Sequence, residues 1–153
     1  MINYQKDIIA QFKTAITAIG TSTFKEVGEY PFDVPNIGSK YPAALVEDGN
    51  EDKSSVEIQR NQSVTMDYLV PVWLYTQINQ TRIATILDYQ VAIEDAILDD
   101  SMLTALGVKI DCISLLGVEK GDRQEPLDMY SVGYDSNISI RKINFVVTFT
   151  TAR

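Results

Sequence analysis

Two stretches of alternating residues are unusually long for a chain of 153 residues. Across 64–76 and 137–151, apolar side chains occupy nearly every second position, a period that predicts β-strands. At about 3.3 Å per residue, the first strand would span roughly 43 Å. A compact domain of this length has a diameter of only about 40 Å. These strands must therefore bend, break or project, and a projecting hairpin leaves backbone groups uncovered unless another chain covers them.

Each long strand contains one natural place to bend. Pro71 has no N–H group, so it must lie at an edge, a bulge or a break in the sheet. In the last strand Ile138 and Ile140 are even, whereas the later apolar residues are odd: Ile143, Phe145, Val147 and Phe149. A change of phase moves side chains to the other face, which predicts a bulge near Arg141 and Lys142.

Two segments have the periodicity of amphipathic helices. Residues 4–19 repeat apolar side chains at helical spacing, with Asn3 as a candidate N-cap and Gly20 as a stop. Residues 80–100 carry a broad apolar stripe of Ile83, Ile86, Leu87, Val91, Ile93, Ile97 and Leu98. Gln90 and Glu94 interrupt this stripe, so they either extend to solvent at its edge or meet another subunit.

Shorter elements complete the predicted order. Strands are expected over 24–29, 43–47 and 108–119, an extended loop over 30–42, and a polar turn over 48–54. A hairpin turn is expected at Asn61-Gln62, and a long polar loop at 120–136. The chain is therefore predicted to be a single α+β domain, 1–153. Its mixed, mostly antiparallel twisted sheet would carry the N-terminal helix and one long central helix, plus a projecting β-hairpin.

Composition excludes most catalytic chemistry. There is no histidine and one cysteine, so imidazole-based triads, imidazole metal sites and intrachain disulfides are absent. Cys112 lies among Ile110, Ile113 and Leu115, which predicts an inert buried thiol. We predict no catalytic, metal-binding or cofactor-binding residue and no enzymatic activity. No signal peptide or membrane helix is recognisable.

The net charge is −8, and the longest basic cluster is the pair Arg141-Lys142. Nucleic acid is therefore not expected as a ligand, because phosphate recognition needs a basic groove or stripe. Two groups of carboxylates dominate the chain: Asp48, Glu51, Asp52, Glu94, Asp95, Asp99 and Asp100. They form either a solvated face or, in an assembly, an acidic lumen or rim that repels DNA over the roughly 8 Å screening length. The turn lacks the EF-hand pattern.

A few side chains are candidates for contacts between subunits. Trp73 and Tyr75 share one face of the long strand, where aromatic rings are either covered by a helix or used at an interface. Tyr130 and Tyr134 lie in the long polar loop, and loop tyrosines either anchor contacts or pack their own loop. Arg141 and Lys142 are the basic candidates.

The order of these elements resembles the tail terminator (tail completion) proteins of long-tailed bacteriophages. The segments that carry the resemblance are the N-terminal helix, the proline-marked entry Tyr41-Pro42-Ala43-Ala44-Leu45-Val46, the strand 70–77 leading into the helix 80–100, the hydrophobic segment 102–108 and the final strand 143–150. The resemblance covers nearly the whole chain as a pattern, with no diagnostic motif.

The resemblance implies a structural virion protein that forms a ring, usually a hexamer, on the last ring of the tail tube. Such a ring ends tube polymerisation and joins the tail to the head-side connector. Expected partners are further copies of the chain, the tail-tube protein and a connector or neck protein, with DNA only as passing cargo and no membrane. The expected location is the tail or neck of the virion, after assembly in the host cytoplasm.

Three other interpretations remain open. The chain could be another neck or head–tail joining protein; tube proteins usually have less long helix. It could be an intracellular binding or regulatory domain with a ferredoxin-like arrangement. It could be an acidic hydrolase that uses a carboxylate pair, although no convergent polar pocket is recognisable.

Overall fold

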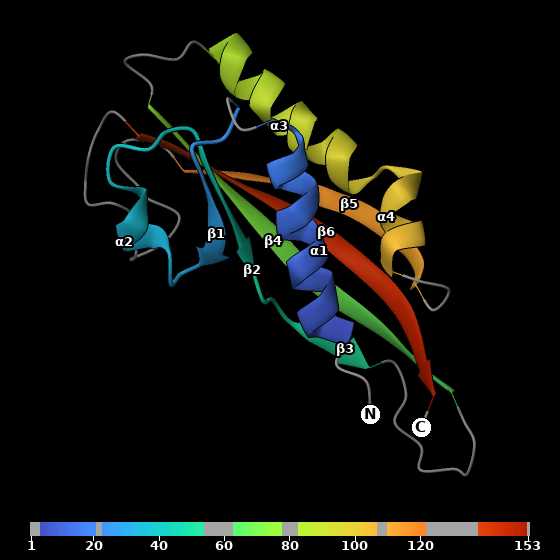
Figure 1. Ribbon diagram of the computed structural model, residues 1–153. Helices are drawn as coiled ribbons and strands as arrows, with labels where there is room; N and C mark the ends of the chain where they lie inside the picture. Colours follow the sequence, from blue (N-terminus) through green and yellow to red (C-terminus); the bar gives the residue numbers. More distant parts are fainter. Residues whose placement is uncertain are drawn as a thin grey trace.

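The computed structural model describes residues 4–20, 23–53, 63–77, 83–106, 110–121 and 138–152. Within these ranges one sheet has the order β1-β2-β4-β6-β5, with β3 also paired to β4 (Figure 1). The strands are β1 (Glu26–Tyr30), β2 (Ala43–Glu47), β3 (Glu51–Lys53), β4 (Ser63–Gln77), β5 (Ile110–Gly121) and β6 (Ile138–Ala152). Only β1 and β2 are parallel among these pairs. The prediction of an α+β fold with a mixed, mostly antiparallel sheet is confirmed.

The helices α1 (Tyr4–Ala18), α3 (Ile83–Ile97) and α4 (Asp100–Leu106) cover one face of this sheet (Figure 1). The helical spacing of α1 buries Ile8, Phe12 and Ile16, and the Phe12 ring meets the edge of Phe145 at 5.9 Å between centroids. Burial of such a stripe contributes more to helix stability than intrinsic propensity does. The N-terminal helix is therefore confirmed, one residue shorter than predicted.

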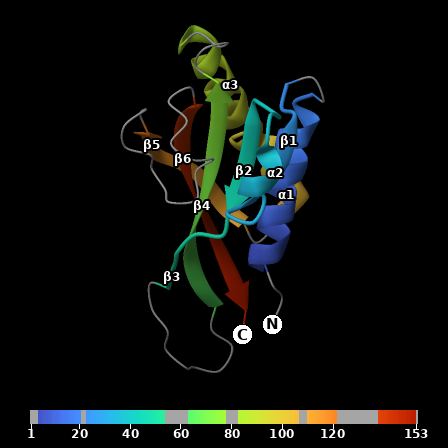
Figure 2. The same cartoon turned by 90° about the vertical axis from the view of Figure 1, so that its left-hand side faces the viewer.

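The two long strands pair with one another over their whole length, from Ser63 opposite Ala152 to Gln77 opposite Ile138. Figure 2 shows them as one twisted ribbon that runs the length of the molecule and extends, with β3, past the end of α1. The strands therefore both twist and project. Residues 54–62, which include the expected turn at Asn61-Gln62, lie outside the described residues.

The change of phase in β6 has a different cause from the predicted bulge. The register between β4 and β6 runs without interruption past Arg141 and Lys142, so β6 contains no bulge against β4 there. Instead, each face of the sheet has its own core. Ile143 and the later odd residues of β6 pack under α1 and α3, whereas Ile138 and Ile140 pack on the opposite face with α2 (Val34–Ile37). The alternation changes because the covering layer changes sides.

Pro71 lies at a break in the pairing of β4, one of the three positions that its missing N–H allows. β2 pairs with β4 over residues 72–75, and β3 pairs with it over 66–68, so Pro71 falls between the two. The N–H of Leu69 donates to the Asn50 carbonyl at 2.8 Å on this same edge. N–H groups two residues apart in a strand point to the same side. The proline therefore occupies a position where no ladder bond is needed.

Two helical boundaries differ from the sequence prediction. The expected loop at 30–42 contains α2, in which Pro35 stands in the first turn, where a missing N–H costs nothing. The expected helix at 80–100 ends at Ile97, and α4 begins at Asp100. The chain turns between them because Asp99 caps α4: its Oδ1 accepts the Ser101 N–H at 2.8 Å. The hydrophobic segment from Met102 is therefore helical through Leu106.

Candidate interaction site

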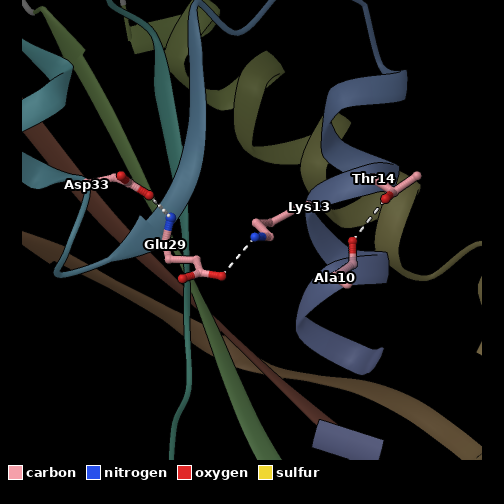
Figure 3. A network of polar contacts seen from close by, with 5 residues as sticks. All are labelled: Ala10, Lys13, Thr14, Glu29 and Asp33. Carbon is pink, nitrogen blue, oxygen red and sulfur yellow. Dashed lines mark hydrogen bonds and ion pairs between the residues drawn. The ribbon is translucent and has the colours of Figure 1, made fainter. Parts of the chain in front are cut away.

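One hollow in the described part of the chain lies between α1 and the β1–β2 end of the sheet. It has a volume of about 430 Å³. We call it the α1 cleft, and its walls are Gln5, Lys6, Ile9, Ala10, Lys13, Glu29, Tyr30, Phe32, Val46, Asp48 and Tyr68. Lys6, Ile9 and Lys13 lie three to four residues apart, so the helical period turns them to one side of α1. Figure 3 shows Lys13 reaching across from α1 to Glu29, with 2.8 Å between Nζ and Oε1.

Asp33 closes the outer edge of β1 beside this cleft. The Glu29 N–H donates to Asp33 Oδ2 at 2.7 Å (Figure 3). The Asp33 N–H donates in turn to the Glu29 carbonyl at 2.8 Å. Gly28 is required here, because a Cβ at that position would collide with the Asp33 carboxylate. Both backbone groups of Glu29 are thus used within the chain. This edge is blocked against pairing with another strand at that residue.

Tyr68 forms the floor of the cleft and donates its hydroxyl to Asp48. Burial, and then this bond to a carboxylate, raise the pKa of Tyr68 well above its ordinary value. The phenol therefore stays protonated and holds Asp48 in place. A group with so high a pKa is a poor proton donor or acceptor near neutral pH. The contact is structural.

The aromatic candidates Trp73 and Tyr75 are inside the molecule. Trp73 is 3% exposed; its ring stacks on Tyr30 at 4.3 Å, and its Nε1–H donates to Glu47 at 3.2 Å. Lys142 Nζ lies 5.1 Å from the centre of the same ring and 3.7 Å from Glu119 Oε2. Both rings belong to the core covered by α2. They pack against this chain's own residues and offer no surface to a partner.

Arg141 is also internal, and it explains the polar residues in the stripe of α3. Its Nη1 donates to Gln90 Oε1 at 2.9 Å, and Gln90 Nε2 donates to Glu94 Oε1 at 3.1 Å. Nε of Arg141 is buried without a hydrogen-bond partner, and burial lowers the pKa of the guanidinium. Gln90 and Glu94 are therefore part of a hydrogen-bonded chain within this molecule. Gln90 connects the buried guanidinium of Arg141 to the half-exposed carboxylate of Glu94.

The two acidic groups lie on different elements. Asp48 follows β2 and Glu51 and Asp52 lie in β3, whereas Glu94 and Asp95 end α3 and Asp99 and Asp100 begin α4. Figure 1 places β3 and the junction of α3 with α4 apart. The hydrogen bond from the Ser101 N–H lowers the pKa of Asp99. Asp99 and Asp100 thus stand at a helix N-terminus, where negative charge is favourable. The expected lumen or rim depends on an assembly.

The structure exposes apolar residues that the sequence placed in the core. Of the α3 stripe, only Ile86, Ile93 and Ile97 are buried. The other four are between 41% and 69% exposed: Ile83, Leu87 and Val91 lie in a line on the outside of the helix, and Leu98 directly follows its last residue. We call this line the α3 ridge. The breadth of the apolar stripe could have indicated this exposure from the sequence, because a helix that packs on a sheet needs a narrower apolar face.

The edge strand β5 also exposes apolar side chains, Leu115 and Leu116. Leu116 lines a hollow with Leu69, Lys142 and Asn144, so it lies on the face of the sheet opposite α3. Cys112 is exposed too, which corrects the prediction of a buried thiol. A register shift between Ile110 and Cys112 puts one extra residue into β5, so the pattern of the neighbouring isoleucines does not extend to the cysteine.

The described ranges contain no group of three cysteine or carboxylate residues placed to hold a metal ion. None of their helices has the length and apolar character that crossing a membrane requires. Tyr130 and Tyr134 lie outside the described residues, as does most of the expected loop at 120–136.

Comparison with known proteins gives a likeness of fold. No family model matches the sequence, and no curated protein matches it. Among solved structures, a chain from "Virion of native gene transfer agent (GTA) particle" superposes with a TM-score of 0.51 at 14% identity. The match covers 96% of this chain and 94% of that one. The two chains therefore share their fold from end to end.

Proposed function

We propose that this chain is a structural virion protein of the phage-tail type, specifically a tail terminator. It would form a ring on the last ring of the tail tube, stop tube growth and present a surface to the head-side connector. The observation that carries the proposal is the fold shared along 96% of the chain with a chain of a virion particle. The order of elements, which resembles tail terminators along nearly the whole chain, supports the finer assignment.

The distribution of surfaces supports a role in assembly over one in catalysis. The α1 cleft holds an ion pair and a tyrosine that stays protonated, which is not the constellation of an acid and a base near neutral pH. The α3 ridge and the exposed leucines of β5 form apolar surface on the outside of the molecule. Such surface marks contacts with other proteins.

The test is tube polymerisation with purified components. Tail-tube protein from the same genome is polymerised with and without this chain, and tube lengths are measured by electron microscopy. A terminator shortens the tubes in proportion to its concentration and adds a ring at one end. Tubes of unchanged length with bare ends would refute the assignment. If the chain instead binds only the connector, the function is that of another neck or head–tail joining protein.

A further inference from the structure

The α3 ridge points away from α1. Ala96 lines a hollow together with residues of α1, so that side of α3 faces α1. Leu87 lies nine residues before Ala96, about two and a half helical turns, and therefore points to the opposite side. In the sheet β1 and β5 are the two ends of the strand order. The ridge thus lies toward β5, and the α1 cleft lies at the β1 end.

These two flanks differ in shape and in charge. The ridge is convex and apolar, and α3 carries three carboxylates (Asp88, Glu94 and Asp95) and no basic residue. The cleft is concave, with Phe32 at its wall 78% exposed. It is lined by α1, which carries two lysines and one aspartate. The walls of the cleft hold two lysines and two carboxylates, so their charges balance. Two ridges facing each other would bring the carboxylates of two α3 helices together, whereas a ridge in a cleft sets acidic α3 against a surface without net charge.

From this we propose that the α3 ridge of one copy docks in the α1 cleft of the next copy. The occupant of each surface is therefore a second copy of this chain. Because the two surfaces are different and lie on opposite flanks, the contact is heterologous, and repeating it generates a ring when the rotation closes. The proposal rests on the proposed function, since it specifies how the ring would be built. Phe32 and Ile9 provide the apolar walls for Leu87 and Val91.

The test uses one variant for each surface and a matched control. Val91→Lys puts a cation on the ridge, and Phe32→Glu puts an anion in the cleft wall, opposite acidic α3. Each variant replaces an apolar side chain of the proposed contact with a charge that docking would bury. Thr85→Lys adds the same cation to the same helix at an exposed position outside the ridge. Self-association is measured by sedimentation and light scattering, under reducing conditions because Cys112 is exposed. Circular dichroism checks that each variant is folded, and Leu87→Lys replaces Val91→Lys if that variant is not.

Each surface variant should weaken self-association by at least about tenfold, as expected for a central apolar contact, and Thr85→Lys should associate like the wild type. Mixing the two surface variants is decisive. Val91→Lys keeps an intact cleft and Phe32→Glu keeps an intact ridge, so an equimolar mixture should form dimers and nothing larger.

Several outcomes would overturn the pairing. Normal association of either surface variant would do so, as would a mixture that stays monomeric or a wild type that is monomeric at millimolar concentration. If Val91→Lys still forms rings, the pairing is wrong but the proposed function stands. If wild-type protein leaves tube length unchanged, the proposed function is wrong whatever the result of mixing.

Discussion

Replacing Trp73 tests the claim that the second face of the sheet holds a true core. The side chain is 3% exposed, so Trp73→Ala should lower the free energy of unfolding by about 3–5 kcal/mol, the usual cost of a large core truncation. Trp73→Phe keeps an aromatic ring on Tyr30 but loses the hydrogen bond to Glu47 and weakens the contact with Lys142. Because Glu47 and Lys142 are half-exposed, the cost should be about 1–2 kcal/mol.

The assay is urea unfolding in dilute solution, followed by far-ultraviolet circular dichroism. Trp73 is the single tryptophan of the chain, so wild-type fluorescence reports this site alone. Tyr30→Leu should therefore shift the emission to longer wavelength, because it uncovers one face of the indole. Self-association should be the same in Trp73→Phe as in the wild type. A loss below about 1 kcal/mol for Trp73→Ala, within the range of surface substitutions, would refute the second core.

Three further substitutions test single contacts. Gln90→Leu should lower the free energy of unfolding in urea by about 1.5–3 kcal/mol, because it removes an acceptor from buried Arg141. The double variant Gln90→Leu, Arg141→Met should recover much of this loss. If it does not, the loss does not come from the hydrogen bond between Gln90 and Arg141. Asp33→Ala should lower the free energy of unfolding by about 1 kcal/mol and increase aggregation, because it opens the β1 edge. Asp33→Asn keeps a side-chain oxygen that can accept the Glu29 N–H, so it should aggregate less. Equal light scattering from the two variants would argue against protection of the edge by Asp33. Asp99→Ala should lower the melting temperature at pH 7, because the cap of α4 is lost. The folded-state pKa of Asp99 is lowered, so its contribution is present above the ordinary carboxylate pKa and disappears as the pH falls through the lowered value. The difference between wild type and Asp99→Ala should therefore vanish in acid, and a difference that persists there would rule out the capping role of the charge.

Local patterns in the sequence were sufficient for most of the fold. Periodicity located α1 to within one residue, the apolar run after the proline-marked loop located β2 at 43–47, and the missing N–H of Pro71 limited it to an edge, a bulge or the break where it lies. These features depend on near neighbours in the chain. The division between α3 and α4 was visible in principle, because Asp99 is a good N-cap residue, but a continuous apolar stripe outweighed it.

Features that depend on distant neighbours were not predictable in the same way. A bulge and a change of covered face give the same shift of phase in the sequence of β6. Only the position of α2, which covers Ile138 and Ile140, distinguishes the two causes. Burial of Trp73 and Arg141 likewise depends on what packs over them. The α1 cleft requires α1 and β1 to lie side by side, and no motif signals it.

The mass of the wild-type protein in solution is the most direct test of the proposed ring. Multi-angle light scattering from micromolar to millimolar concentration, followed by electron microscopy of the largest species, measures both stoichiometry and symmetry. A ring subunit that joins ridge to cleft predicts closed particles with cyclic symmetry. A two-fold dimer that does not grow further would contradict a heterologous contact, and with it the ring.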